Sequence, residues 1–132
     1  DITCENKNEK SFSDIEEGKW YENYIKIAAS CGIVSGMPDG NFGIGNMITR
    51  QDMAVILSNL LKNNNISVVA GKPDFYDFNE VDSYAEIAVM TLSKLKIING
   101  FEDNTYRPHG NMTRAEAAVV INRILTYLKG GK

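Results

Sequence analysis

With 132 residues, of which 43% are hydrophobic, the chain is long enough to bury one modest core or two small cores that pack together. Its formal net charge of -3 and its pI near 5.1 argue against a protein that binds nucleic acid in general or a membrane surface, because both need a basic face. The longest apolar runs, such as residues 53–57, are far too short to span a bilayer, so no membrane insertion is expected.

An internal repeat organises the chain. Residues 20–61 align with residues 84–125 without a gap. The strongest matched pairs are Ile33/Ile97, Gly36/Gly100, Asp39/Asp103, Thr49/Thr113, Arg50/Arg114, Ala54/Ala118 and Leu61/Leu125. A Phe-x-Asp sequence precedes each copy, as Phe12-Ser13-Asp14 and as Phe75-Tyr76-Asp77. We therefore predict a polar N-terminal arm over residues 1–11, repeats over 12–62 and 75–129, and a linker over 63–74 that is rich in turn-forming residues.

The two cysteines, Cys4 in the arm and Cys31 in the first repeat, have the spacing of neither a metal site nor a disulfide framework. Cys31 aligns with Leu95 of the second repeat, which favours the role of a small buried apolar residue. The alternative is a disulfide bond between Cys31 and Cys4.

Each repeat begins with a predicted helix whose apolar residues share one face. In the first copy these residues are Trp20, Tyr24, Ala28 and Cys31, and in the second they are Tyr84, Ile87, Ala88, Thr91, Leu92 and Leu95. Gly32 stands where a C-cap glycine is expected, and Ser83-Tyr84-Ala85-Glu86 fits a capping box. Trp20 is interpreted as a core residue of this face, with a platform for stacking a sugar ring as the alternative.

A long loop then leads to a second helix in each repeat. In the first copy Pro38-Asp39-Gly40 predicts a tight turn within this loop. The second helices begin at Thr49 and at the capping box Thr113-Arg114-Ala115-Glu116, and they extend to about Lys62 and Leu128. Apolar residues cover more than half of their circumference, which is typical of buried helices. We therefore expect the second helices at the centre, with the first helices and the loops outside.

Arg50 and Arg114 occupy the first turn of these second helices, where the helix dipole mildly disfavours a cation. Their presence in both copies indicates a use for the guanidinium group, because helix amides and a forked cation together suit a carboxylate or a phosphate. Alternatively, each arginine pairs with a loop carboxylate, Asp39 or Asp103, and holds the loop in place. The residues alone favour neither hypothesis over the other.

The order of these motifs is specific. A Phe-x-Asp sequence and an aromatic-led helix precede Gly-Ile-Val-Ser-Gly-Met-Pro-Asp-Gly-Asn-Phe and Ile-Thr-Arg-Gln-Asp, and the second copy repeats the order. Residues 12–61 and 75–128 thereby resemble the S-layer homology (SLH) module. The resemblance implies an all-α fold of tandem helix–loop–helix repeats, packed as a spindle with the second helices central. It also implies non-covalent anchoring of an extracellular protein to an anionic, often pyruvylated, secondary cell-wall polysaccharide of a Gram-positive-type bacterium.

The resemblance further implies where the ligand binds. In SLH modules the arginine of Thr-Arg-Ala-Glu and the loop Gly-Tyr-Pro-Asp-Gly line grooves between repeats. Carried over by position, the ligand-binding residues are Arg50, Arg114, Gly36, Met37, Pro38, Asp39, Gly100, Phe101, Glu102 and Asp103, and Trp20 is an additional candidate. The chain departs from the family at Met37, which replaces the loop aromatic residue, and at Glu102, which replaces the proline. It also has two repeats where the family usually has three.

We expect no catalytic activity and no cofactor or metal. No nucleophile, base and orienting partner can be assembled from the sequence. Asp39-Gly40-Asn41 does not begin a calcium loop, because Arg50 stands where the loop needs a bidentate glutamate. The alternative function is a protein–protein assembly module. Two helices with wide apolar arcs should leave a strip of Val, Ile and Leu exposed, to be covered by the arm, by the linker or, as we favour, by a second chain in a homodimer.

Overall fold

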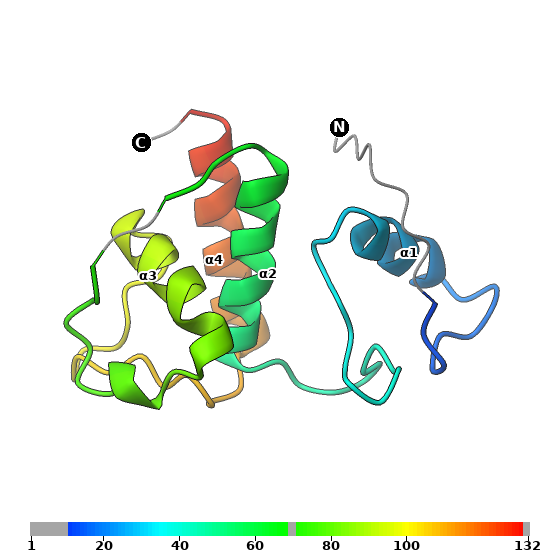
Figure 1. The fold of residues 1–132 in the computed structure, drawn as a ribbon, viewed down its shortest axis with the longest axis horizontal. Helices are drawn as coiled ribbons and strands as arrows, with labels where there is room; N and C mark the ends of the chain where they lie inside the picture. The colour runs from blue at the N-terminus through cyan, green and yellow to red at the C-terminus, as the bar shows by residue number, and fades with distance from the viewer. Residues whose placement is uncertain (1–10, 69–70, 131–132) are drawn as a thin grey trace. The chain divides into compact units, whose positions relative to one another are not determined.

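The computed structural model describes residues 11–68 and 71–130, and over these residues the fold is all-α, as predicted (Figure 1). Within this described part of the chain, four α-helices follow one another: α1 (Glu22–Ser30), α2 (Arg50–Asn63), α3 (Glu86–Lys94) and α4 (Arg114–Leu128). Two 3-10 turns, η1 (Phe78–Glu80) and η2 (Ser83–Ala85), precede α3. The described residues form no strand, and their backbone pairs in sheet fashion only at an isolated antiparallel bridge between Thr49 and Asn111. The central packing of α2 and α4 in a spindle stays a prediction.

The chain divides into two compact units. Unit 1 comprises Asp1–Asn46 and Asn59–Ile66, and unit 2 comprises Met47–Ser58 and Ser67–Lys132. The division passes through α2, so the start of this helix belongs to the first repeat by sequence and to unit 2 by its contacts. Residues of both predicted repeats therefore meet inside unit 2.

In unit 1 the Phe-x-Asp sequence holds the loop that follows α1. The Asp14 carboxylate accepts hydrogen bonds from the backbone amides of Phe42, Gly43 and Ile44 at 2.7, 2.8 and 3.0 Å. These bonds, with that from Phe42 the largest contribution, lower the pKa of Asp14. The Phe12 ring leaves no space for a side chain at Gly36, where a Cβ atom would lie 2.3 Å from the ring and where φ is +76°. Gly36 thus has a structural role, set by both space and backbone conformation.

Unit 2 contains the same arrangement. Asp77 accepts hydrogen bonds from the amides of Tyr106 and Arg107, each at 2.8 Å. Phe75 stacks on Tyr106 with ring centroids 5.5 Å apart, and a Cβ atom on Gly100 would lie 2.5 Å from the Phe75 ring. The matched residues of the two repeats therefore hold their loops in the same way.

Three helix caps and one turn form as predicted. Gly32, at φ +71°, ends α1, and the Ile33 amide donates to the Ala28 carbonyl at 3.0 Å in the pattern of a Schellman cap. The amides of Asp52 and Glu116 donate to the hydroxyls of Thr49 and Thr113, at 3.2 and 3.1 Å. The Pro38-Asp39-Gly40 turn is closed by a hydrogen bond from the Gly40 amide to the Met37 carbonyl at 3.1 Å.

The predicted face of the first helix is wrong in the first copy. The buried residues of α1 are Ile25 and Ala29, whereas Trp20 and Tyr24 are 81% and 69% exposed. α1 begins at Glu22, so Trp20 lies before the helix, and its spacing from Tyr24 does not place it on a helical face. The interpretation of Trp20 as a core residue is therefore incorrect, and its exposure is compatible with the alternative role in stacking.

The start of the first helix is also different in the second copy. Ala88, Thr91 and Leu92 of α3 are buried as predicted, but Tyr84 and Ile87 are exposed. Residues Ser83–Ala85 form η2, and Ala85, which has no side-chain cap, precedes α3, so the capping box at Ser83 is wrong. Hydrogen bonds to the start of α2 fix this segment instead: the Asp82 amide donates to Gln51, and the Tyr84 hydroxyl donates to Asp52 at 2.6 Å.

Cys31 is half-buried and disulfide-bonded. Its interpretation as a small apolar residue without a bond is therefore wrong. The partner proposed as the alternative, Cys4, lies outside the described residues.

The two second helices differ in how much of their apolar surface is covered. α2 buries Gln51, Ala54, Leu57, Ser58 and Leu61. α4 buries Val120 and Ile124, whereas Val119, Ile121 and Leu125 are 47%, 43% and 46% exposed. Ile121 and Leu125 are four residues apart and share one face of the helix, whereas Val119 lies on another face. We call Ile121 and Leu125 the α4 strip. Part of the predicted strip of exposed Val, Ile and Leu is thus present on α4, without Val119. Which segment covers it stays a prediction. Among the described helices, none has the length and apolar character needed to cross a membrane.

Candidate ligand-binding site

Unit 2 contains a pocket of about 330 Å³ beneath the loop that joins α3 to α4. The loop contributes one wall, and the first turn of α2 and the first three turns of α4 contribute the others. The lining residues are Arg50, Ile98, Asn99, Gly100, Phe101, Tyr106, Met112, Ala115, Glu116, Val119, Val120 and Arg123. The pocket is therefore mostly apolar, with two arginines and one glutamate among its charged groups.

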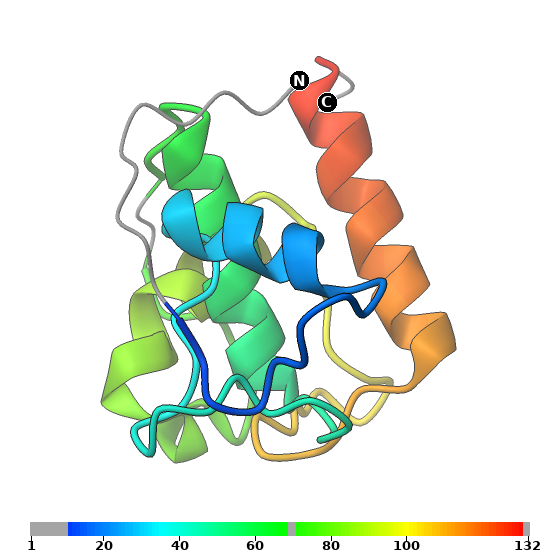
Figure 2. The same ribbon diagram turned by 90° about the vertical axis from the view of Figure 1, so that its right-hand side faces the viewer.

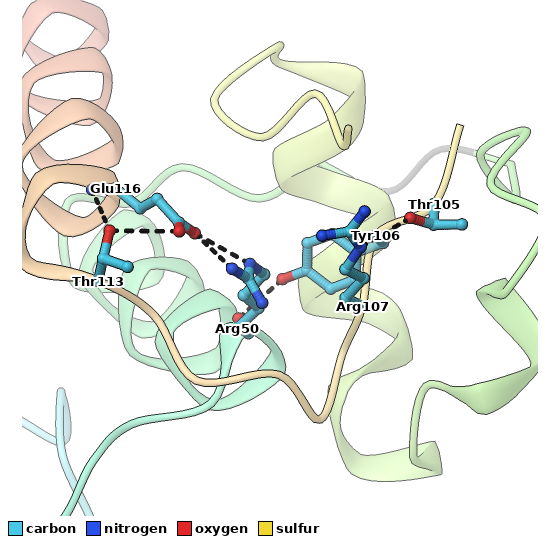
Figure 3. Close-up of polar contacts among 6 residues, drawn as sticks. All are labelled: Arg50, Thr105, Tyr106, Arg107, Thr113 and Glu116. Carbon is cyan, nitrogen blue, oxygen red and sulfur yellow. Dashed lines mark hydrogen bonds and ion pairs between the residues drawn. The ribbon is translucent and has the colours of Figure 1, made fainter. Parts of the chain in front are cut away.

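Arg50 forms an ion pair with Glu116 in this pocket (Figure 3). Its Nε and Nη2 atoms both donate to Oε2 of Glu116, at 3.0 and 2.7 Å. Only 11% of the Arg50 side chain is exposed. The guanidinium carbon also lies 4.7 Å from the centroid of the Phe101 ring, a distance at which a cation is attracted to an aromatic face.

The backbone places Arg50 at this point. The start of α2 and the end of the α3–α4 loop lie together at the bottom of Figures 1 and 2. The Arg50 amide donates to the Gly110 carbonyl at 3.0 Å, and the Tyr106 hydroxyl donates to the Arg50 carbonyl at 2.7 Å. Burial raises the pKa of Tyr106, so this hydroxyl keeps its proton and remains a donor. A Cβ atom on Gly110 would lie 2.3 Å from Nη1 of Arg50, so the guanidinium group occupies space that only a glycine leaves open.

Glu116 is fixed from two sides. Arg50 holds Oε2, and the Thr113 hydroxyl donates to Oε1 at 3.2 Å (Figure 3). The hydrogen bond from Arg50 is the largest cause of a lowered pKa at Glu116. The carboxylate is therefore charged at neutral pH, and it compensates the charge of Arg50.

Arg123, on α4, was not predicted as a site residue. Its Nη1 atom donates to the Ile97 carbonyl at 3.2 Å. In the first repeat the aligned residue is Asn59, whose Nδ2 atom donates to the Ile33 carbonyl at the same distance of 3.2 Å. The alignment of Asn59 with Arg123 was the signal in the sequence, because it places a charge in the second repeat where the first has a neutral amide.

The structure brings together three of the predicted ligand-binding residues: Arg50, Gly100 and Phe101 line one pocket. Arg114 is exposed at the start of α4 and does not line it. Glu102 and Asp103 lie in the same loop as Phe101, but neither lines the pocket. The remaining candidates belong to unit 1 and are Trp20, Gly36, Met37, Pro38 and Asp39. Of these five residues, Trp20 and Met37 have largely exposed side chains.

The alternative hypothesis for the arginines named the wrong carboxylates. Arg50 pairs with Glu116, and not with Asp39 or Asp103. Asp39 accepts a hydrogen bond from the Asn41 amide at 2.9 Å within its own turn. Asp103 pairs with Arg107 at 3.2 Å, and its hydrogen bonds with Thr105 are the main cause of its lowered pKa. Each loop aspartate therefore stabilises its own loop.

The pocket suits an anionic ligand with apolar parts. Two arginine cations and one glutamate anion leave an excess of one positive charge among its lining residues. Nη1 of Arg50 and Nε and Nη2 of Arg123 make no hydrogen bond within the described residues, so donors remain for a ligand. Among the large apolar lining residues, Val119 is the most exposed and offers surface to the apolar part of a ligand. Tyr106 is buried, and the guanidinium carbons of Arg50 and Arg107 lie 4.7 and 3.9 Å from the centroid of the Phe101 ring.

Comparison with known proteins identifies the class to which this all-α module belongs. The profile of the S-layer homology domain matches residues 11–54 and 68–118. The chain is 37% identical to an amylopullulanase of Thermoanaerobacterium thermosulfurigenes over 121 residues. These aligned residues cover 86% of this chain and 6% of that protein. It is 31% identical to the S-layer protein of Bacillus licheniformis over 113 residues, and these residues cover 85% of this chain and 12% of that protein. It is 28% identical to the cellulosome-anchoring protein of Acetivibrio thermocellus over 116 residues, and these residues cover 87% of this chain and 26% of that protein.

The chain belongs to the S-layer homology domain family. It spans between 5% and 26% of the length of the curated relatives described in these comparisons, and the enzymes among them match it through this small part alone. The family and its S-layer members make the chain a cell-surface anchoring module of a Gram-positive-type bacterium.

Proposed function

We propose that this module holds a larger extracellular protein on the bacterial surface by binding an anionic secondary cell-wall polysaccharide, and that the pocket of unit 2 is the binding site. The observation that carries the proposal is the position of Arg50. The helix dipole gives no reason for a cation in the first turn of α2, yet Arg50 lies there, largely buried, in a pocket with unused hydrogen-bond donors.

The composition of the pocket supports a pyruvylated sugar as the ligand. A pyruvyl ketal carries a carboxylate and a methyl group on the same carbon atom. The carboxylate matches the two arginines, and the methyl group matches the aliphatic side chains of Ile98, Met112 and Val119. The half-buried side chain of Phe101 lies beside them.

The test is sedimentation of the protein with purified cell-wall sacculi, before and after the secondary polymer is stripped from them. The unmodified chain should sediment with the intact sacculi and remain in solution with the stripped ones. Arg50→Ala should weaken binding on the order of ten- to a hundredfold, because a partly buried, charge-assisted contact is lost.

Arg114→Ala is the matched comparison, because Arg114 occupies the same motif position on α4. It should weaken binding less than Arg50→Ala does, because Arg114 is exposed outside the pocket. Equal sedimentation with intact and stripped sacculi contradicts the proposal. Normal binding by Arg50→Ala, with unfolding several degrees lower, would show that the arginine only holds the loop.

A second candidate function is assembly with another copy of the chain. The observation that favours it is the α4 strip, where two large aliphatic side chains on one face of the helix are each more than two-fifths exposed. Soluble monomers seldom leave contiguous apolar surface uncovered. This function does not exclude anchoring, because Ile121 and Leu125 lie outside the pocket lining.

A further inference from the structure

The charges in the pocket are not equivalent. Glu116 accepts two hydrogen bonds from Arg50. Its Oε2 atom lies 2.7 Å from Nη2 of Arg50, so the carboxylate compensates the charge of the guanidinium group. Arg123 donates to a neutral carbonyl, that of Ile97, and forms no ion pair with any described residue. An anion that approaches Arg50 also meets the Glu116 carboxylate, whereas an anion that approaches Arg123 meets an uncompensated cation.

We propose that Arg123 is a ligand-binding residue and supplies the charge attraction by which the pocket selects an anionic sugar. Arg50 then contributes oriented hydrogen bonds and the contact with Phe101, which act at short range, as part of a neutral ion pair. This inference rests on the proposed function of the same pocket, and it assigns a different contribution to binding to each of the two arginines.

The first repeat provides an internal reference for Arg123. Asn59 makes the same hydrogen bond to the equivalent carbonyl, so an amide satisfies the structural requirement at this position. The longer, charged side chain of Arg123 therefore exceeds what the backbone contact needs. Arg123 is half-buried and lines the pocket.

The experiment measures the affinity for secondary polymer released from sacculi over a series of salt concentrations. Binding of the unmodified chain should weaken as salt rises, because salt screens the attraction between charges. Arg123→Asn should lower the affinity on the order of tenfold at low salt and make it nearly independent of salt. Arg123→Lys, which keeps the charge, should retain the salt dependence.

A charge-matched control separates Arg123 from Arg50. The double variant Arg50→Gln with Glu116→Gln removes a neutral pair and leaves the excess charge of the pocket unchanged. It should bind more weakly than the unmodified chain at every salt concentration, but with the same salt dependence. Polymer whose carboxylates have been reduced to alcohols should bind the unmodified chain weakly and without salt dependence.

The outcomes distinguish the two proposals. If the unmodified chain does not bind the polymer at any salt concentration, the proposed function fails. If it binds with a salt dependence that Arg123→Asn retains, the proposed function stands and the role of Arg123 is overturned. Thermal unfolding of each variant checks folding, and Arg123→Gln replaces Arg123→Asn if the shorter amide lowers stability.

Discussion

Arg50 and Arg114 occupy the same place in the same motif, but their surroundings differ. Arg50 meets Glu116 and Phe101 of the second repeat, whereas Arg114 is exposed and has no ion pair within the described residues. The sequence predicts the pair of arginines, because their repetition is visible in it. It does not predict this difference, because the loop that covers Arg50 lies about fifty residues further along the chain.

At the residue scale, Gly110→Ala tests how strictly Arg50 is positioned. A Cβ atom at Gly110 would meet Nη1 of Arg50 at 2.3 Å, so the guanidinium group must move. The Cβ atom would also lie 3.3 Å from the Arg107 carbonyl oxygen, a tight contact that a small backbone shift relieves. Because the main displaced atom is the end of a long side chain, we expect a stability loss of about 1 kcal/mol. Binding to sacculi should weaken on the order of tenfold, because Arg50 no longer points its donors into the pocket.

The control for this substitution is Gly71→Ala. No atom lies within 4 Å of a Cβ atom at Gly71, and φ is not positive at either glycine, so both changes avoid backbone strain. Gly71→Ala should leave binding and stability unchanged. If Gly110→Ala binds as well as Gly71→Ala does, the position of the guanidinium group is not critical.

At the scale of the helices, the sequence predicts best where the determinants are local. The N-caps at Thr49 and Thr113 and the C-cap at Gly32 depend on residues a few positions away, and they form as expected. The capping box at Ser83 fails because Asp82 and Tyr84 bond to Gln51 and Asp52 of a distant helix. Local patterns cannot include such competing long-range hydrogen bonds.

Removal of the N-caps should lower stability. Thr49→Ala and Thr113→Ala each remove the acceptor of a helix amide, and each should cost about 1 kcal/mol of unfolding free energy. Thr113→Ala should have the larger effect on binding, because the Thr113 hydroxyl also holds Oε1 of Glu116. Chemical denaturation and sacculus binding measure the two effects separately.

Thr126→Ala is the matched control for the caps, because Thr126 is exposed within α4 and caps no helix. It should leave stability unchanged or raise it slightly, since alanine has the higher helix propensity. A loss at Thr126 equal to that at the caps would show that the cap hydrogen bonds contribute little.

At the scale of the whole molecule, the sequence predicts the class of fold, the family and the existence of the α4 strip. These depend on the order and spacing of motifs, which the repeat makes visible. The pocket is less predictable, because its three charged lining residues, Arg50, Glu116 and Arg123, come from both repeats and meet only in the folded unit. Arg123 in particular lies outside the motifs from which the ligand-binding residues are predicted.

The α4 strip predicts self-association. We expect a homodimer, because a self-complementary apolar patch is the commonest route by which such a surface is covered. Light scattering over a concentration series should show the mass doubling by high micromolar concentration. Leu125→Lys should keep the chain monomeric with little loss of stability, because Leu125 is 46% exposed and lies outside the pocket.

A chain that remains monomeric at high micromolar concentration contradicts the dimer. Thr126→Lys, a neighbouring exposed position on α4, controls for the added charge and should still associate.

The ion pair between Arg50 and Glu116 also constrains how the two repeats can diverge. Duplication of a repeat yields two identical motifs, each with its own arginine and its own acidic residue. In this chain the arginine of one copy bonds to the glutamate of the other. The remaining members of the two motifs have other roles: Asp52 accepts a hydrogen bond from Tyr84, and Arg114 lies exposed. A change of Arg50 or Glu116 alone would therefore leave the other charge without its partner, whereas Asp52 and Arg114 form no ion pair with each other within the described residues.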